Sequence, residues 1–251
     1  MAENSIYAVV LAAGQGTRMK SALPKVLHKI AGRPMVSHLL ATVDSLHAEK
    51  AVVVVGPNME QVAEAVAPHA VAVQHKQQGT GDAVKAAREA LKGASGSVLV
   101  LYGDTPLVRK ETLESMIKER ENGADVVVLG FCPADPARYG RLIVKNGTLE
   151  RIVEYKDASE TERAVRLCNS GVMCVAAEKL FGWLDRLTND NAAGEYYLTD
   201  LVALARADGG KAVAIECAES EVAGANSRAD LAAIEAVVQN ELRKKFLAQG
   251  V

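Results

Sequence analysis

The stretch VVLAAGQGTRMKSALPK, residues 9–25, contains the features that decide the fold of this chain. It belongs to an apolar run, residues 7–13, of the kind that a strand buried on both faces of a parallel sheet requires. The run ends at Gly14 and Gly16. Glycine lets the backbone turn sharply and brings its N–H groups close to a ligand. A buried strand followed by a glycine-rich turn therefore predicts an α/β fold with a ligand site after its first strand.

Residues 14–33 carry positive charge without neighbouring acids. No acidic residue lies between Glu3 and Asp44. The net charge of the whole chain is −2, so a site for an anion has to come from a local segment such as this one. The glycine turn and the unopposed positive charge predict a site for a polyanion, most simply a nucleoside triphosphate. The basic residues of the segment are Arg18, Lys20, Lys25, Lys29 and Arg33.

Composition limits the class of protein. The 251 residues allow one large α/β domain or two small ones, and 49% hydrophobic with 24% charged residues is ordinary for a soluble globular protein. The balanced charge favours neither a nucleic acid nor a membrane partner, and no apolar run approaches the ~18 residues that span a bilayer. The N-terminus lacks the basic segment of a signal peptide. Four cysteines without a CxxC pair indicate free thiols, so we expect a cytoplasmic protein.

Strand and helix patterns alternate through the first half of the chain. This alternation predicts βαβ units and a Rossmann-like, mostly parallel sheet with helices on both faces. Right-handed crossovers place the loops that follow the strands along one edge, where ligands bind. Beyond the first strand, the patterns predict strands over 51–55, 71–74, 98–102 and 125–131 and helices over 35–46, 59–67, 82–91 and 110–121.

The second half is less regular. The dipeptide Asn146-Gly147 is a strong hairpin signal and predicts an inserted β-hairpin between strands at 141–144 and 149–154. Ser227, with Asp230 three positions on, predicts a capping box that begins a last helix ending near residue 248. Further strands are expected over 172–176 and 212–216, and further helices over 181–187 and 198–207.

Known phosphate-binding loops do not account for the opening stretch. It contains no GxxxxGK[ST], so it is not a Walker A loop. Met19 stands where a dinucleotide fingerprint has its third glycine, and the second strand ends in Val55-Gly56 without an acid for a ribose.

A set of motifs carries a more specific resemblance. LAAGQGTRM at 11–19, followed by LPKVL at 23–27, resembles the signature of the nucleoside-diphosphate-sugar pyrophosphorylases. Further along the chain, matching motifs are QGTGDA at 78–83, LYGDTPL at 101–107, YGR at 139–141, IVEYKDA at 152–158, NSGVM at 169–173 and NDNAAGEYYLTD at 189–200. The full set is similar to the uridyltransferase domain of the bifunctional GlmU family, the N-acetylglucosamine-1-phosphate uridyltransferases. GEYYLTD, residues 194–200, best separates this family from its relatives.

The resemblance implies a fold of the nucleotide-diphospho-sugar transferase type and a set of roles. It implies that Arg18 and Lys25 are catalytic, and that Mg²⁺ is held by Asp104 and Asn226. The implied nucleotide-binding residues are Leu11, Ala12, Ala13, Gly14, Gln74, Gly79, Thr80, Tyr102, Gly103 and Asp104. The implied sugar-phosphate-binding residues are Gly140, Glu154, Asn169, Tyr197 and Thr199.

The implied reaction transfers a uridylyl group from UTP to N-acetylglucosamine 1-phosphate, releases pyrophosphate and supplies a precursor for cell-wall and lipopolysaccharide synthesis. The implied domains are a nucleotidyltransferase domain over 1–227, with a nucleotide-binding half over about 1–105 and a sugar-phosphate-binding half over about 106–227, and a connecting helix over 228–251. No hexapeptide repeat follows, so we expect no acetyltransferase β-helix and, if the chain forms a homo-oligomer, a weaker one.

Other interpretations stay open on the sequence alone. Asp104 also fits an ordinary turn aspartate, and Asn226 fits a helix-capping residue. Arg18 and Lys25 also fit solvated surface charges. At the level of function, the alternatives are a nucleotidylyltransferase for another sugar 1-phosphate, a glycosyltransferase that uses a nucleotide sugar, and a nucleotide-binding regulator without turnover.

Overall fold

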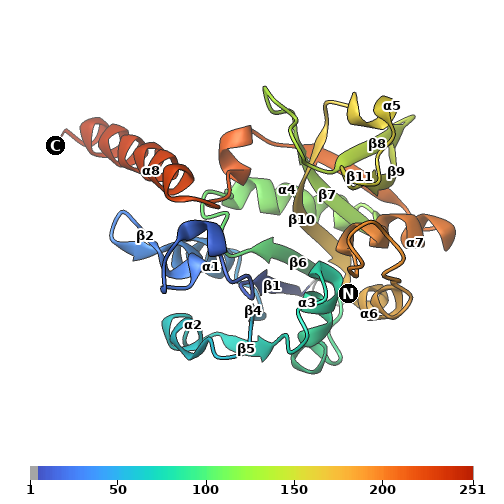
Figure 1. Cartoon of the computed structure of the whole chain (residues 1–251), viewed down its shortest axis with the longest axis horizontal. Coiled ribbons are helices and arrows are strands. Elements are labelled where there is room, and N and C mark those ends of the chain that lie inside the picture. The colour runs from blue at the N-terminus through green and yellow to red at the C-terminus, as the bar shows by residue number, and fades with distance from the viewer. Residues whose placement is uncertain (1–4, 251) are drawn as a thin grey trace.

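A nine-stranded sheet lies at the centre of the computed structural model (Figure 1). The structure describes residues 5–250; residues 1–4 and 251, which fall within the expected segments 1–227 and 228–251, lie outside it. The order is β11-β7-β10-β6-β1-β4-β5, and the hairpin β8–β9 joins the sheet through β10. The strands of this sheet are β1 (Ile6–Leu11), β4 (Lys50–Val55), β5 (Ala70–Val73), β6 (Ser97–Tyr102), β7 (Val126–Phe131), β8 (Arg141–Lys145), β9 (Thr148–Val153), β10 (Cys168–Ala176) and β11 (Ala212–Glu216).

Helices cover both faces of the sheet, as predicted. Alternate residues of β1 point to opposite faces, so Val10 packs in a core with α1, α2 and α4, whereas Val9 packs in a core with α3, α6 and α7. Burial on both faces explains why the strands are continuous apolar runs. The helices are α1 (Met35–Ser45), α2 (Glu60–Ala65), α3 (Thr80–Ala86), α4 (Lys110–Glu121), α5 (Glu160–Arg163), α6 (Ala177–Asp185), α7 (Leu201–Ala207) and α8 (Arg228–Ala248).

Short elements complete the chain. The strands β2 (Lys29–Ile30) and β3 (Arg33–Pro34) form a separate two-stranded sheet after the first loop. Neither these strands nor α5 was predicted, because elements this short leave no periodic pattern. The 3₁₀ turns are η1 (Thr17–Met19), η2 (Lys25–Leu27), η3 (Glu89–Leu91), η4 (Leu198–Asp200) and η5 (Glu219–Val222).

The sheet is mixed, although mostly parallel. β10 runs antiparallel to both β6 and β7. A pattern of apolar residues does not encode strand direction, so the sequence predicted the strand but not its orientation. β10 also begins at Cys168, ahead of the predicted start at 172, and its register with β7 shifts between Asn169 and Met173.

The carboxyl ends of the parallel strands meet at one edge of the sheet. There, backbone hydrogen bonds hold the loop that follows each strand against its neighbour. Ala12 N donates to Val54 O at 2.7 Å, and Gly103 N donates to Leu11 O at 2.9 Å. Gln74 N donates in the same way to Val55 O, at 2.8 Å. This edge therefore brings together the residues that follow β1, β5 and β6.

The last helix, α8, projects from the body of the molecule (Figure 1). The predicted capping box is present: the Ser227 side chain accepts from Asp230 N, and the Asp230 side chain accepts from Ser227 N. Ile234 packs with Ile30, Met35 and Ala225 in a small third core. No helix within residues 5–250 combines the length and the apolar character needed to cross a bilayer.

Candidate functional site

The glycine turn after β1 places Lys25 at the sheet edge. Gly16 has φ +64°, a left-handed conformation that side chains rarely adopt. A Cβ atom on Gly16 would also lie 2.5 Å from the Cβ of Lys25. The second glycine of the turn is therefore required for Lys25 to approach the loop.

Arg18, Lys25, Asp104 and Asn226 form one polar cluster. The Lys25 ammonium pairs with Asp104 Oδ2 and donates to Asn226 Oδ1 at 3.3 Å. Arg18 Nη2 donates to the same Asn226 oxygen at 2.9 Å. The structure thus brings together the two residues predicted to be catalytic and the two predicted to bind metal, across more than 200 positions of sequence.

A pocket of about 310 Å³ adjoins this cluster. Gly103 is the one predicted nucleotide-binding residue outside its lining; a Cβ there would lie 3.1 Å from Val26. The predicted residues that line it are Leu11, Ala12, Ala13, Gly14, Lys25, Gln74, Gly79, Thr80, Tyr102 and Asp104. Lining residues that the sequence reasoning missed are Gln15, Val26, Gln77, Ala83 and Glu195.

The GEYYLTD motif packs against the QGTGDA motif and closes the pocket. Tyr196 N donates to Gln78 O, and Gly81 N donates to Tyr196 O, both at 2.8 Å. Leu198 N donates to the Thr80 hydroxyl at 3.1 Å. A Cβ on Gly79, which has φ +112°, would lie 2.8 Å from Tyr196 O. Close backbone contact between the two motifs accounts for the glycine at this position.

The predicted sugar-phosphate residues are contiguous. Asn169 N donates to Gly140 O at 2.9 Å, and a Cβ on Gly140 would lie 3.4 Å from the Glu154 carboxylate. The Thr199 hydroxyl donates to Glu154 Oε1 at 3.2 Å. Glu154 and Tyr197 line a second pocket of about 490 Å³. This pocket shares Glu195 with the first one, so the two pockets adjoin; its basic lining residues are Arg138, Lys156 and Arg163.

Burial and nearby acids perturb two groups of the site. Burial raises the pKa of the Glu154 carboxyl, and negative charges at Asp157, Asp200 and Glu195 add to this effect. Burial also raises the pKa of the Tyr102 hydroxyl, so this side chain is neutral at physiological pH.

A metal ion fits the polar cluster. One ammonium group contacts both predicted ligand oxygens, Asp104 Oδ2 and Asn226 Oδ1, so these atoms converge on one point where a cation is favourable. Carboxylate and amide oxygens suit Mg²⁺, which usually takes few protein ligands and completes its shell with water and substrate phosphates. Accordingly, residues 5–250 contain no group of three or more His, Cys, Asp or Glu side chains that could hold a metal by themselves.

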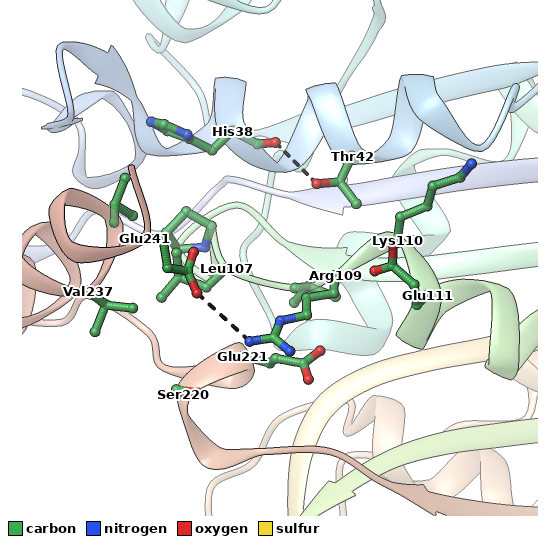
Figure 2. A pocket seen from close by; sticks show the side chains of 13 residues that line it. His38, Thr42, Leu107, Arg109, Lys110, Glu111, Ser220, Glu221, Val237 and Glu241 are labelled. Carbon is green, nitrogen blue, oxygen red and sulfur yellow. Dashed lines mark hydrogen bonds and ion pairs between the residues drawn. The ribbon is translucent and has the colours of Figure 1, made fainter. Parts of the chain in front are cut away.

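A further pocket lies away from this site, beneath α8 (Figure 2). It is bounded by α1, the start of α4, η5 and α8, and Arg109 and Glu241 face each other across it at 3.8 Å. On α1, the Thr42 hydroxyl donates to His38 O at 3.5 Å. None of the predicted site residues lines this pocket.

Comparison with known proteins identifies the family. A family model described as the MobA-like NTP transferase domain matches residues 8–206. The chain is 56% identical over 245 residues to the bifunctional protein GlmU of Rhodospirillum rubrum. This alignment covers 97% of this chain and 55% of that protein. It is 57% identical over 247 residues to the bifunctional protein GlmU of Ruegeria sp., and that alignment covers 97% of this chain and 55% of the relative. The chain therefore spans about half the length of these relatives, and the resemblance carried by the motifs is confirmed.

A solved structure has a similar fold. It is described as a glucose-1-phosphate thymidylyltransferase from Bacillus anthracis, and it superposes with a TM-score of 0.76 over 93% of this chain and 95% of that one. The identity is 20%, so the match supports the fold alone. The predicted Rossmann-like, mostly parallel sheet is confirmed.

Proposed function

The chain belongs to the MobA-like NTP transferase family, and on that premise we propose that it transfers a uridylyl group from UTP to N-acetylglucosamine 1-phosphate. The products are UDP-N-acetylglucosamine and pyrophosphate. The observation that carries the proposal is the cluster of Arg18, Lys25, Asp104 and Asn226 beside the first of two adjoining pockets. Two pockets suit two substrates, and the cluster supplies charge where their phosphates would meet.

The reaction needs charge stabilisation more than proton transfer. An oxygen of the sugar 1-phosphate attacks the α-phosphorus of UTP, and the bond from that phosphorus to the pyrophosphate oxygen breaks. The nucleophile is already an anion, so no general base is required. The barrier comes from bringing two anions together and from charge on the transferred group. Arg18 and Lys25 would hold the phosphates in line and stabilise that charge.

Mg²⁺ is the proposed cofactor, with Asp104 and Asn226 as its protein ligands. When bound, it would neutralise charge on the substrate phosphates. Lys25 contacts both ligand oxygens, so its ammonium would have to leave Asp104 and turn toward a phosphate. This movement would deliver a cation to the reacting centre.

Substitution of Asp104 tests the metal site. We expect Asp104→Ala to lose most of the response of turnover to added Mg²⁺, because one of two protein ligands is absent. The measurement is a magnesium titration of pyrophosphate release at fixed UTP. A titration midpoint equal to that of the parent protein would remove Asp104 from the metal site.

The pocket after β1 would hold the nucleotide. Gln74 is buried, with 5% of its surface exposed, and lines this pocket at the end of β5. A side-chain amide can both donate to and accept from a base. The nitrogen of Gln74 already donates to two protein oxygens, so its amide oxygen would accept from the base.

The second pocket would hold the sugar phosphate. Glu154 and Tyr197 line it, Gly140 and Thr199 lie next to the Glu154 carboxylate, and Asn169 is hydrogen-bonded to Gly140. The residues over about 106–227 would therefore supply the acceptor side, and those over about 1–105 most of the nucleotide side. The helix over 228–251 would act as the connecting segment.

The wider setting is part of the same proposal. UDP-N-acetylglucosamine would serve as a precursor for peptidoglycan and lipopolysaccharide. All four cysteines are free thiols, which fits the expected cytoplasmic location. Assembly into a homo-oligomer is also proposed, and size-exclusion chromatography with light scattering would test it.

A direct assay of pyrophosphate release decides the reaction. The assay contains UTP, Mg²⁺ and N-acetylglucosamine 1-phosphate, with glucosamine 1-phosphate and glucose 1-phosphate as comparison acceptors. We expect pyrophosphate only with a sugar 1-phosphate present and the highest kcat/KM with the N-acetylated one. Absence of pyrophosphate, with nucleotide binding retained, would reject transferase activity in favour of a binding protein.

A further inference from the structure

The amide of Gln74 can adopt only one orientation. Its Nε2 atom lies 3.0 Å from Gly79 O and 2.8 Å from Asp82 Oδ2. Both partners are oxygens without a hydrogen to donate, because one is a backbone carbonyl and the other belongs to a carboxylate. An amide oxygen at this position would face two acceptors, so the atom there must be the nitrogen. Both N–H donors are thereby used, and only Oε1 remains for a ligand.

Asp82 is the charged partner in this arrangement. It lies in the first turn of α3, a favourable place for a carboxylate, and is half-buried. The same oxygen, Oδ2, also accepts from Gln78 N at 3.2 Å. One carboxylate oxygen therefore ties the Gln74 side chain to the segment that begins the helix. A hydrogen bond to an ionised acceptor is roughly twice as strong as a neutral one.

Neighbouring polar groups do not replace Asp82. The Gln77 amide, which lines the same pocket, donates to Ala13 O at 2.7 Å and holds the first loop instead. Lys85, one turn further along α3, lies over the Tyr196 ring at 5.1 Å. Gly79 O is therefore the only other acceptor of the Gln74 amide that the described residues supply.

We propose that Asp82 is a specificity-determining residue, which selects uracil over cytosine by holding Gln74 with its oxygen toward the base. The inference rests on the proposed function, because it assumes that the pocket holds the base of a nucleotide. The ring nitrogen N3 carries a hydrogen in uracil and a lone pair in cytosine. Gln74 Oε1 can accept from the first, whereas it meets the second as an unpaired acceptor in a buried site. Asp82 itself touches no substrate and acts through Gln74.

Three variants test the proposal. Asp82→Leu removes the acceptor and hinders a replacement water. Asp82→Asn keeps an oxygen that can accept from both Gln74 Nε2 and Gln78 N. Glu60→Leu is the matched control, because Glu60 is an exposed acid in the first turn of α2, away from the pocket.

Two measurements are made on each protein. One is the ratio of kcat/KM for UTP to that for CTP, with N-acetylglucosamine 1-phosphate and Mg²⁺. The other is the ratio of Kd values for UTP and CTP by calorimetry without acceptor. Far-UV circular dichroism and thermal unfolding check that each variant is folded.

We expect Asp82→Leu to reduce the preference for UTP about tenfold or more, with Asp82→Asn close to the parent protein. The control should keep the full preference. An unchanged UTP:CTP ratio in folded Asp82→Leu would overturn the role of Asp82. A parent protein that binds CTP as well as UTP would overturn it too. Selective UTP binding without turnover, with the selectivity lost in Asp82→Leu, would support the inference while rejecting the proposed transferase reaction, so the two failures are distinguishable.

Discussion

Lys25 is the residue on which the proposed reaction depends most. Its ammonium reaches Asp104 and Asn226, and its aliphatic carbons pack against Gly16. We expect Lys25→Ala to lower kcat by about 10²–10³-fold, the usual effect of removing one preorganised group that stabilises transition-state charge. Some loss of thermal stability is expected as well, because each side chain of the ion pair is only 16% exposed and Asp104 would lose its partner. Steady-state pyrophosphate release gives the rate.

Lys29→Ala is the matched control for this prediction. Lys29 belongs to the same basic segment, but its side chain is exposed on β2. Turnover within about twofold of the parent protein is expected. Near-normal turnover in Lys25→Ala itself would show that the assignment of Lys25 is wrong.

Glu154 should make the stability of the fold depend on pH. Burial raises the pKa of its carboxyl above the ordinary value of 4.5, so the folded protein binds more protons than the unfolded chain between these two pKa values. Across that window this group lowers stability as pH rises, and the cost persists at neutral pH. Glu154→Gln removes the ionisation and keeps an oxygen for the Thr199 hydroxyl. We therefore expect the variant to unfold at a higher temperature than the parent at pH 7.

The same substitution should weaken the acceptor site. A neutral amide accepts a hydrogen bond less strongly than a carboxylate, so KM for N-acetylglucosamine 1-phosphate should rise about tenfold while KM for UTP stays close to its original value. Thermal unfolding at pH 4 and pH 7, with both KM values, checks the prediction. A stability difference that is the same at both pH values would contradict the assigned pKa shift.

Sequence reasoning found most single residues of the candidate site through motif strings. It missed Gln15 and Glu195, which lie inside the motif strings but were given no role, and Gln77, which lies outside them; all three line the first pocket. It also could not predict that the amide nitrogen of Gln74 is fully used. That result depends on Gly79 O, a backbone atom whose position no side-chain identity reveals.

At the scale of elements, α8 holds the loop that carries Arg18 and Lys25. Arg228 Nε donates to Met19 O at 3.2 Å, and Glu235 Oε2 accepts from Ala31 N at 2.7 Å. These contacts fix the chain directly after Arg18 and again beyond Lys25. The first half of α8 is therefore expected to position the two side chains proposed to be catalytic without touching substrate.

Arg228→Met tests this positioning role. Methionine keeps the unbranched first part of the side chain and loses the donor to Met19 O, so we expect kcat to fall several-fold with KM for both substrates nearly unchanged. Arg228→Lys should recover part of the loss, because its ammonium can donate to the same carbonyl. Arg243→Met, an exposed position further along α8, is the control and should behave like the parent protein. An equal loss in both methionine variants would contradict a specific role for Arg228.

The predicted elements agree best with the structure where a segment keeps one type of helix or strand over its whole length. The helix predicted over 110–121 matches α4 to the residue. The helix predicted over 82–91 is instead α3 followed by the 3₁₀ turn η3, and that over 198–207 is η4 followed by α7. The spacing of apolar residues continues through the change between an α-helix and a 3₁₀ turn, so the sequence does not show where the change occurs.

At the scale of the whole molecule, ligand binding should stabilise the fold. A ligand at 100 times its Kd adds about 2.7 kcal/mol to the free energy of unfolding, and 1 kcal/mol raises Tm by about 2–4 °C in a chain of this size. UTP with Mg²⁺ at that concentration should therefore raise Tm by about 5–10 °C. Differential scanning fluorimetry measures the shift, with ATP as the comparison nucleotide. A shift that is equal for the two nucleotides would argue against a site selective for uracil.

The sequence predicted the architecture best in the regions where successive elements of the chain are also neighbours in the fold. β1, β4 and β5 pair side by side, as successive βαβ units do. The contacts that complete the site are of another kind. Asn226 reaches Arg18 from 208 positions away, and Tyr196 reaches the segment after Gln74 from the other half of the chain. No local sequence pattern predicts contacts between residues so far apart in the chain, so only the resemblance to a known family indicated these two contacts.

The capping box of α8 has a consequence for how activity is lost on heating. Asp230 Oδ2 accepts from Ser227 N, as a helix cap does, and also from Asn226 N at 3.0 Å. The residue proposed to bind metal is thereby held by the hydrogen bonds that start the helix. Helix ends fray at free energies far below that of global unfolding. Each fraying event at this end would release Asn226 while the nine-stranded sheet stays intact, so inactivation would begin several degrees before the protein melts.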